Sequence, residues 1–283
     1  MAYRGSCLCG DVAWESGELS ILHHCHCSIC RKAHGAPFAS FAYASADAFR
    51  WLSGESGIVA YESSPGFIRN FCGQCGSVLP AHDPDGKRVI PLGCLDDDPE
   101  IEAVAHVFAA SRPDWSEIRD AVPQFDALPP GMEGPTPLER DRPSSADSDT
   151  SHGSCLCAAV TWTLTGPAIV ARNCHCGRCR KARSAAFTAN LVMPPGGVHF
   201  TGGEDVTRTY KVPDARFFCQ TFCTVCGGAV PRVDPDRGIA IVPLATLDDA
   251  PPAVPSEHIF VGSKAGWHEI LDDLPQYPGR PPG

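Results

Sequence analysis

The sequence predicts a mainly β protein made of two tandem domains of the same kind. Three observations lead to this prediction. An internal repeat covers most of the 283 residues. Short segments rich in β-branched and aromatic residues recur in both halves. Seven cysteines occur in the same order in each half. A chain of this length also accommodates two ordinary domains.

The repeat consists of sequence blocks that recur at an offset of 148 to 152 residues. Small insertions in loops explain the drift of the offset. The paired blocks are "GSCLCGDVAWE" (5–15) with "GSCLCAAVTWT" (153–163), "CHCSICRK" (25–32) with "CHCGRCRK" (174–181), "FIRNFCGQCG" (67–76) with "FCQTFCTVCG" (218–227), and "HVFAASRPDWSEIRDAVPQF" (106–125) with "HIFVGSKAGWHEILDDLPQY" (258–277).

The repeat divides the chain into a first domain at 1–127, a linker at 128–150 and a second domain at 151–283. The linker is rich in proline, serine and acidic residues and has no apolar period, which is typical of an exposed connection. Each domain of about 120 residues can build its own core, yet is small enough to gain stability from a bound metal.

Within each domain the pattern predicts short strands and few helices. The expected strands are 11–16, 37–45, 49–54, 58–63 and 87–95 in the first copy, and 160–166, 185–193 and 198–203 in the second. Aspartate, proline and glycine at 82–87 and 233–238 predict hairpin turns. Short helices are expected only after the "CHC" phrases and at 114–120.

Charge and cysteine content narrow the function classes. The net charge of −10 and the pI near 5.5 argue against binding to nucleic acid or to anionic membranes. No apolar run is long enough for a signal peptide or a membrane span. We therefore expect a cytoplasmic protein, where thiols stay reduced and 16 cysteines favour metal over disulfides.

Four of the shared cysteines in each copy form a C-x-C pair and a C-x-x-C pair. The shared set is odd in number, so disulfides cannot account for all of it. On a strand, the two thiols of a C-x-C pair point to the same face, and a C-x-x-C turn adds two more. Four thiolates make a closed, structural zinc site. The predicted ligands are Cys7, Cys9, Cys72 and Cys75, with Cys155, Cys157, Cys223 and Cys226 in the second copy.

The remaining shared thiols are Cys25, Cys27 and Cys30, with Cys174, Cys176 and Cys179 in the second copy. Three thiolates can hold zinc and leave one position open for water or substrate, as in catalytic sites. Two alternatives stay open. A neighbouring side chain such as His23, His24 or Cys94 can close the site, or the thiols can be redox groups without metal.

Other repeated residues surround these thiols. Arg31 and Lys32, like Arg180 and Lys181, follow the three thiols and are predicted to attract an anionic ligand or cofactor; solvated charges are the alternative. His26 and His175 should face away from the metal, because they alternate with its ligands. A role in the core is expected for His106 and His258, as for Trp115 and Trp267.

The order C-x-C, C-H-C-x-x-C-R-K, C-x-x-C-G and H-x-F with a downstream tryptophan resembles the glutathione-dependent formaldehyde-activating enzyme and centromere protein V family. The resemblance covers nearly all of both copies. It implies a β-rich fold with two zinc ions per domain. The two four-cysteine sets would hold structural zinc, and the two three-cysteine sets would form catalytic sites.

For function, the resemblance implies a zinc-dependent carbon–sulfur lyase that joins glutathione and formaldehyde into S-(hydroxymethyl)glutathione. Its partners would be a small thiol and an aldehyde. Two positions differ between the copies: Ala158 replaces Gly10, and Ser184 replaces Gly35. If the second glycine permits a close backbone approach, the second pocket is altered.

Two other classes of function remain. If the protein is a non-catalytic zinc scaffold, we expect a fourth protein ligand to close the three-cysteine site. A nucleic-acid-binding zinc ribbon is disfavoured by the acidic charge. We also expect the duplication to give one chain the paired arrangement that a single-domain relative reaches by dimerising, so the protein is a pseudo-dimeric monomer or a dimer.

Overall fold

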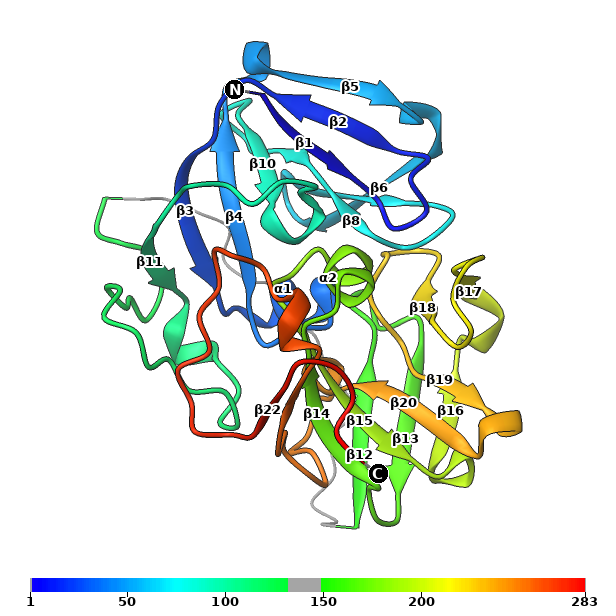
Figure 1. The fold of residues 1–283 in the computed structure, drawn as a ribbon. Helices are drawn as coiled ribbons and strands as arrows, with labels where there is room; N and C mark the ends of the chain where they lie inside the picture. Colours follow the sequence, from blue (N-terminus) through cyan, green and yellow to red (C-terminus); the bar gives the residue numbers. More distant parts are fainter. Residues whose placement is uncertain (1, 132–148, 283) are drawn as a thin grey trace.

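The computed structural model describes residues 2–131 and 149–282. Most of the predicted linker, 132–148, lies outside the described residues. Figure 1 shows the first copy, coloured blue to cyan-green, packed against the second copy, coloured green to red. As the sequence predicts, both copies are mainly β.

The first copy contains three sheets in the order β1-β2-β5, β11-β3-β4-β10-β9 and β6-β7-β8. The β11–β3 pair is parallel and the others are antiparallel. The elements are β1 (Tyr3–Ser6), β2 (Ala13–Ser16), β3 (Ser20–Cys25), α1 (Ser28–His34), β4 (Ala39–Ala44), β5 (Phe49–Ser53), β6 (Ile58–Ser64), β7 (Phe67–Cys72), β8 (Val78–Leu79), β9 (Ala81–His82), β10 (Arg88–Pro91), the 3-10 turn η3 (Leu92–Cys94) and β11 (Ala103–Val107).

The second copy repeats this plan, with sheets in the order β12-β13-β16, β19-β20-β15-β14-β21-β22 and β17-β18. Its elements are β12 (Thr150–Ser154), β13 (Thr161–Thr165), β14 (Val170–Cys174), α2 (Gly177–Arg183), β15 (Thr188–Met193), β16 (Val198–Gly202), β17 (Thr207–Lys211), β18 (Cys219–Cys223), β19 (Arg232–Asp234), the 3-10 turn η7 (Pro235–Arg237), β20 (Ile239–Pro243), the 3-10 turn η8 (Leu244–Thr246), β21 (His258–Ile259) and β22 (Gln276–Tyr277).

Every strand predicted from the sequence contains a strand in the structure, and both predicted turns connect antiparallel strands. Two local predictions are wrong. Residues 114–120 are not helical, because the chain there turns and the Asp120 carboxylate accepts hydrogen bonds from His106 and from the Val122 amide. The Cys7–Cys9 pair lies in a tight turn after β1 instead of on a strand, with Gly10 N–H bonded to the Cys7 carbonyl.

A buried tryptophan anchors the small sheet of each copy. Trp14 and Trp162 are fully buried at equivalent places. Gly5 and Gly153 face them across the strand pairs, where an added Cβ would come within 2.1 and 2.3 Å of the indole rings. Only glycine leaves room for the indole, which explains why "GSC" begins the repeat in both copies.

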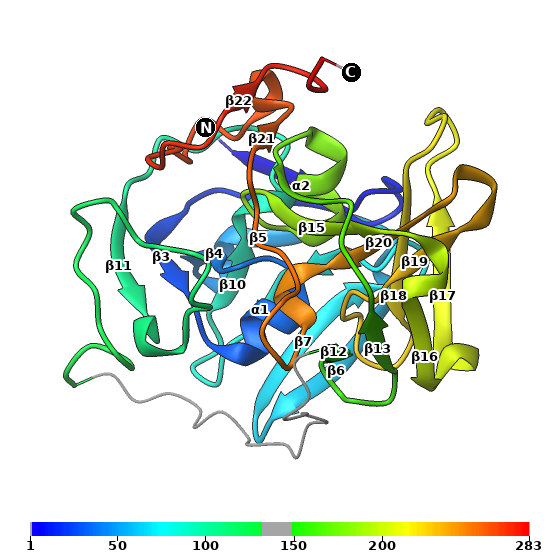
Figure 2. The same cartoon turned by 90° about the horizontal axis from the view of Figure 1, so that it is seen from below.

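The two copies interlock through their helices. α1 contacts η8 of the second copy and α2 contacts η3 of the first, so both helices lie where the copies meet (Figures 1 and 2). The Lys32 ammonium donates to the Ser154 and Thr246 carbonyls and pairs with the Asp248 carboxylate at 2.8 Å. Both side chains of this ion pair are almost fully buried, at 4% and 2% exposure.

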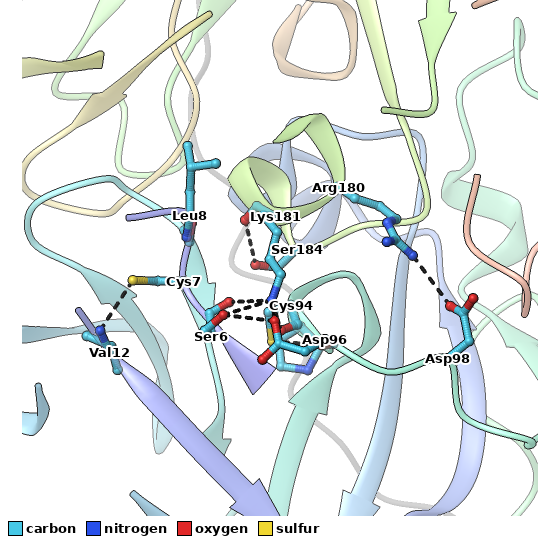
Figure 3. Close-up of polar contacts among 12 residues, drawn as sticks. Ser6, Cys7, Leu8, Val12, Cys94, Asp96, Asp98, Arg180, Lys181 and Ser184 are labelled. Carbon is cyan, nitrogen blue, oxygen red and sulfur yellow. Dashed lines mark hydrogen bonds and ion pairs between the residues drawn. The ribbon is translucent and has the colours of Figure 1, made fainter. Parts of the chain in front are cut away.

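The same contact is repeated in the opposite direction. Lys181 donates to the Ser6 and Cys94 carbonyls and pairs with Asp96, as Figure 3 shows. Both lysines were predicted to attract a ligand, but their ammonium groups are engaged between the copies. Any contact of either lysine with a ligand stays a prediction.

Two glycines and two aromatic rings complete the reciprocal interface. A Cβ on Gly76 would overlap Phe222 at 2.4 Å, and a Cβ on Gly227 would overlap Phe71 at 2.5 Å. An altered second pocket at Ser184 stays a prediction, but Gly35 itself lies at this interface. The atom nearest to its added Cβ is the Ala229 side chain of the second copy, at 2.9 Å, so this glycine serves the contact between copies. The two copies thus make near-symmetric contacts with each other within one chain; the predicted oligomeric state stays a prediction.

Candidate functional site

The structure brings together each set of four predicted zinc ligands. The four sulfur atoms of each set lie within 4.8 Å of one another. The sets are Cys7, Cys9, Cys72 and Cys75, and Cys155, Cys157, Cys223 and Cys226. Thiolates are ligands that zinc prefers, so both clusters are compatible with a zinc ion.

Backbone amides support these clusters from outside. The Val12 amide donates to Cys7 Sγ at 3.4 Å (Figure 3), and the Val160 amide donates to Cys155 Sγ at 3.3 Å. Such bonds orient a thiolate and spread its negative charge. The turns "SCLCG" and "CGQCG" therefore form a preorganised cage from segments more than 60 residues apart.

The three-cysteine sets also converge, and the sulfur atoms of each set lie within 4.8 Å of one another. Cys25 ends β3, Cys27 caps the start of α1 by accepting from the Cys30 amide, and Cys30 lies on the first turn. In the second copy, Cys174, Cys176 and Cys179 occupy the same places around α2. We call these sets the first and second trios.

In the described residues, no fourth histidine, cysteine or carboxylate joins either trio at this spacing. The candidates considered from sequence have other surroundings. His24 bonds the Ser40 hydroxyl at 2.8 Å, and Cys94 donates to the Pro91 carbonyl at 2.9 Å. His23 lines the cavity described below without belonging to the thiol group. The arrangement thus resembles an open site more than a closed one.

The first trio opens into a cavity of about 170 Å³. Its walls are mainly apolar and include Ile29, Phe41 and Leu128. Composition places Leu128 in the linker, but the structure packs it against the core of the first copy. Apolar walls exclude water, which strengthens the electrostatic interactions of any group held inside.

Arg69 carries the positive charge of this cavity. From β7 it donates to Cys30 Sγ at 3.4 Å and to the Ser63 hydroxyl at 3.1 Å. Hydrogen bonds from Cys25 and Cys27, with the Arg69 guanidinium, lower the pKa of the Cys30 thiol well below its ordinary value. Burial lowers the pKa of His23 to about 4, so this histidine is neutral at neutral pH. The sequence analysis missed Arg69, although "FIRNFC" places it three residues before a zinc-type cysteine.

The second trio has a different charged neighbour. The position of Arg69 is taken by Gln220, which is buried and donates to the Ala182 carbonyl at 2.6 Å. The position of His34 is taken by Arg183, a buried guanidinium whose charge interacts with Cys179. Burial lowers the pKa of Arg183 to about 10, which leaves it charged at neutral pH. Each trio therefore has one neighbouring arginine, half-buried Arg69 on β7 or buried Arg183 on α2.

A histidine chain stands behind each trio. His26 Nε2 lies 2.9 Å from His106 Nδ1, and His106 Nε2 lies 3.0 Å from Asp120. The second copy repeats this chain with His175, His258 and Asp272. His26 and His175, which were expected to face away from the metal, thus make hydrogen bonds to a second histidine in each copy. Carboxylate–histidine pairs of this kind fix ring orientation, and here they fix the backbone between two thiols.

The two predicted arginines have distinct positions. Arg180 forms an ion pair with Asp98 of the first copy at 3.4 Å, as Figure 3 shows. Arg31 follows Cys30 on α1 and is half-buried. Ligand binding by either arginine is still a prediction.

No helix in the described part of the chain is long and apolar enough to cross a membrane.

Comparison with known proteins finds one family. The model of the glutathione-dependent formaldehyde-activating enzyme family matches residues 2–111 and 150–263, one match for each copy. A relative from Halomonas elongata that carries this enzyme name is 32% identical over 130 residues, covering 42% of this chain and 82% of the relative. A solved structure of a Rhodobacter sphaeroides protein is 25% identical in sequence. The match covers 34% of this chain and 91% of that protein's chain, with a TM-score of 0.28.

Proposed function

The chain belongs to the glutathione-dependent formaldehyde-activating enzyme family, and from this premise we propose that it catalyses the addition of a small thiol to an aldehyde. Glutathione and formaldehyde are the first substrates to test, because the matching family model and the relative are named for them. The observation that carries the proposal is the first trio, three buried thiols open to a cavity and bonded by the half-buried Arg69. The cysteine usage favours the reducing cytosol as the place of the reaction.

Zinc fits both kinds of cluster. The four-cysteine clusters offer a complete sulfur shell, and each trio offers three sulfur atoms at ligand spacing. We propose four zinc ions per chain, held by the 14 clustered cysteines. When bound at a trio, zinc supplies a coordination position that keeps a substrate thiol in its nucleophilic thiolate form.

The proposed reaction balances without a further reagent. The thiol sulfur forms a bond to the aldehyde carbon, and the carbon–oxygen π bond breaks. The proton that leaves the thiol ends on the aldehyde oxygen, which gives a hydroxymethyl thioether when the aldehyde is formaldehyde. In the reverse direction the carbon–sulfur bond breaks, so the activity is of the carbon–sulfur lyase class.

Residues of the first copy have clear parts in this scheme. Arg69 offsets the negative charge of the three thiolates and lines the cavity where negative charge develops on the aldehyde oxygen. Ile29, Phe41 and Leu128 exclude water from that space. His23 lines the same cavity as a neutral imidazole, which can donate or accept a hydrogen bond there.

The direct test changes Cys27 and Cys176 to alanine together. We expect about four zinc ions per chain to fall to about two, with the fold intact and with thiol-dependent consumption of formaldehyde reduced to the spontaneous rate. Elemental analysis, circular dichroism and trapping of the adduct provide the readouts. A variant that loses all zinc and unfolds would favour a structural scaffold, and a wild-type rate equal to the spontaneous one would refute the enzyme proposal.

A second prediction concerns Arg69. Changing it to glutamine, the residue of the second copy, removes the positive charge beside Cys30. We expect a chelator to remove one zinc ion per chain at roughly tenfold lower concentration, because a hydrogen bond to a charged group contributes about 1.5–3 kcal/mol. Zinc competition by absorbance measures this loss. Arg50→Gln, on the exposed surface of β5, is the matched control; equal loss in both variants would contradict the assigned role.

A further inference from the structure

The two trios are alike, but their surroundings have diverged in charge. Ile29, Ala81 and Leu128 line the first cavity. At the aligned positions, the second copy has Arg178, Arg232 and Arg280. Two further arginines lie in loops that are longer in the second copy: Arg216 in 212–218, which corresponds to 63–67, and Arg237 just before Gly238 in 233–240, which corresponds to 82–88. Three arginines in place of apolar residues, and two more in longer loops, change the ligand chemistry around the second trio.

Four of these arginines contact one residue, Phe217: three lie over its ring and one bonds its carbonyl. The guanidinium carbons of Arg237, Arg216 and Arg280 lie 4.5, 4.7 and 5.9 Å from the centre of the Phe217 ring. Arg232 donates to the Phe217 carbonyl at 3.4 Å. We call Arg216, Arg232, Arg237 and Arg280 the Phe217 arginine cluster. Its members come from three separate segments of the chain, so the fold gathers them.

The cluster lies beside the second trio. Phe218, the next residue after Phe217, packs against the hydrophobic group formed by Cys174, Cys179 and Ile259. Tyr277 packs against the same group and stands three residues before Arg280. In the first copy, Phe67 at the position of Phe218, Ala81 at that of Arg232 and Leu128 at that of Arg280 line the cavity of the first trio. Arg232 and Arg280 thus stand at cavity-lining positions of the repeat, which places the cluster beside the second trio.

The cluster has an excess of positive charge in an acidic chain. Asp234 accepts from Arg232 at 3.1 Å and lies 3.7 Å from Arg237. Within residues 2–131 and 149–282, no ion pair joins Arg216 or Arg280 to a carboxylate. Both are exposed, while the whole chain carries a net charge of −10. Cation–π contacts hold the guanidinium groups together and leave their N–H edges for a ligand.

We propose that the Phe217 arginine cluster binds the carboxylate groups of an anionic thiol and selects that class of cosubstrate at the second trio. Arginine suits carboxylates because its planar fork donates two parallel hydrogen bonds. The first trio lacks this cluster: its 170 Å³ cavity has mainly apolar walls, and Arg69 is the arginine that lines it. The inference rests on the proposed function, because it names the class of thiol that the second trio would activate.

The test compares two ligands that differ only in carboxylate charge. Zinc-loaded full-length protein is titrated calorimetrically with glutathione and with glutathione dimethyl ester. The double variant Arg237→Gly and Arg280→Leu removes two exposed members of the cluster, and leucine is the residue of the first copy at the position of Arg280. We expect it to bind glutathione about tenfold or more weakly than the wild type and to bind the ester equally well. Arg4→Leu, whose side chain is 70% exposed, is the control and should change neither affinity.

Other outcomes would overturn the inference. A double variant that keeps its glutathione affinity, or loses affinity for the ester to the same degree, would show that the cluster does not bind the carboxylate groups. A wild type that binds no glutathione would show the same. S-methylglutathione separates the inference from the proposed function, because it keeps the carboxylates but has no free thiol. Weaker binding of this analogue by the double variant supports the cluster, even if no protein form accelerates adduct formation.

Discussion

Changing Cys72 to alanine is expected to unfold the first copy. The thiol belongs to the four-cysteine cluster, which is buried apart from the half-buried Cys9. Structural zinc contributes about 10–16 kcal/mol of binding free energy to small zinc domains. That is as large as the total stability of a typical domain, so a cluster with three ligands left cannot keep this copy folded. The loss should exceed that of any other single substitution proposed for this chain.

Elemental analysis and urea unfolding measure the effect of Cys72→Ala. Fewer zinc ions per chain should accompany loss of the native circular dichroism, and the second copy should be weakened because it shares the interface. The matched control is Cys219→Ile, which removes a cysteine outside all four clusters and inserts the residue of the first copy at that place. Four zinc ions and normal unfolding in Cys72→Ala would contradict a structural role for the cluster.

The sequence is sufficient to predict the repeat, the β-rich class and the grouping of 14 cysteines into four sets. The trios and the cysteine pairs depend on local spacing, since a C-x-C or C-x-x-C turn brings two sulfur atoms together whatever the rest of the chain does. Joining each C-x-C pair to a C-x-x-C pair more than 60 residues away rested on the four thiolates of a closed zinc site and on the family resemblance. The strands were found because alternating β-branched and aromatic residues report burial directly. The local prediction failed at 114–120, where hydrogen bonds to Asp120 hold an irregular turn.

Contacts between distant segments could not be predicted from the sequence. Lys32 follows an arginine on a short helix, a pattern that predicts an exposed charge. In the structure it is buried in an ion pair with Asp248, which is 216 residues away in the sequence. Arg69 lies on an ordinary strand, and only the fold brings it to Cys30. The Phe217 arginine cluster is spread over three segments for the same reason. A charged side chain has a different role when it is buried, and only the tertiary structure shows which side chains are buried.

Changing Lys32 to methionine is expected to destabilise the protein by about 3–5 kcal/mol, the usual effect of breaking a buried ion pair. The substitution keeps the apolar stem of the side chain but leaves the buried Asp248 carboxylate without its cation. It also removes donors from the Ser154 and Thr246 carbonyls. Because all these partners belong to the second copy, the lost energy is that of the contact between copies.

The reciprocal lysine provides the comparison for Lys32→Met. Lys181→Met should have a smaller effect, because the Asp96 side chain is 43% exposed and water can solvate it after the cation is lost. Urea unfolding of both variants gives the two free energies. Adding Asp248→Asn to Lys32→Met should recover part of the stability, since no uncompensated charge then remains buried. Equal effects of the two lysine substitutions, or no recovery, would show that burial of the charge does not set the strength of this interface.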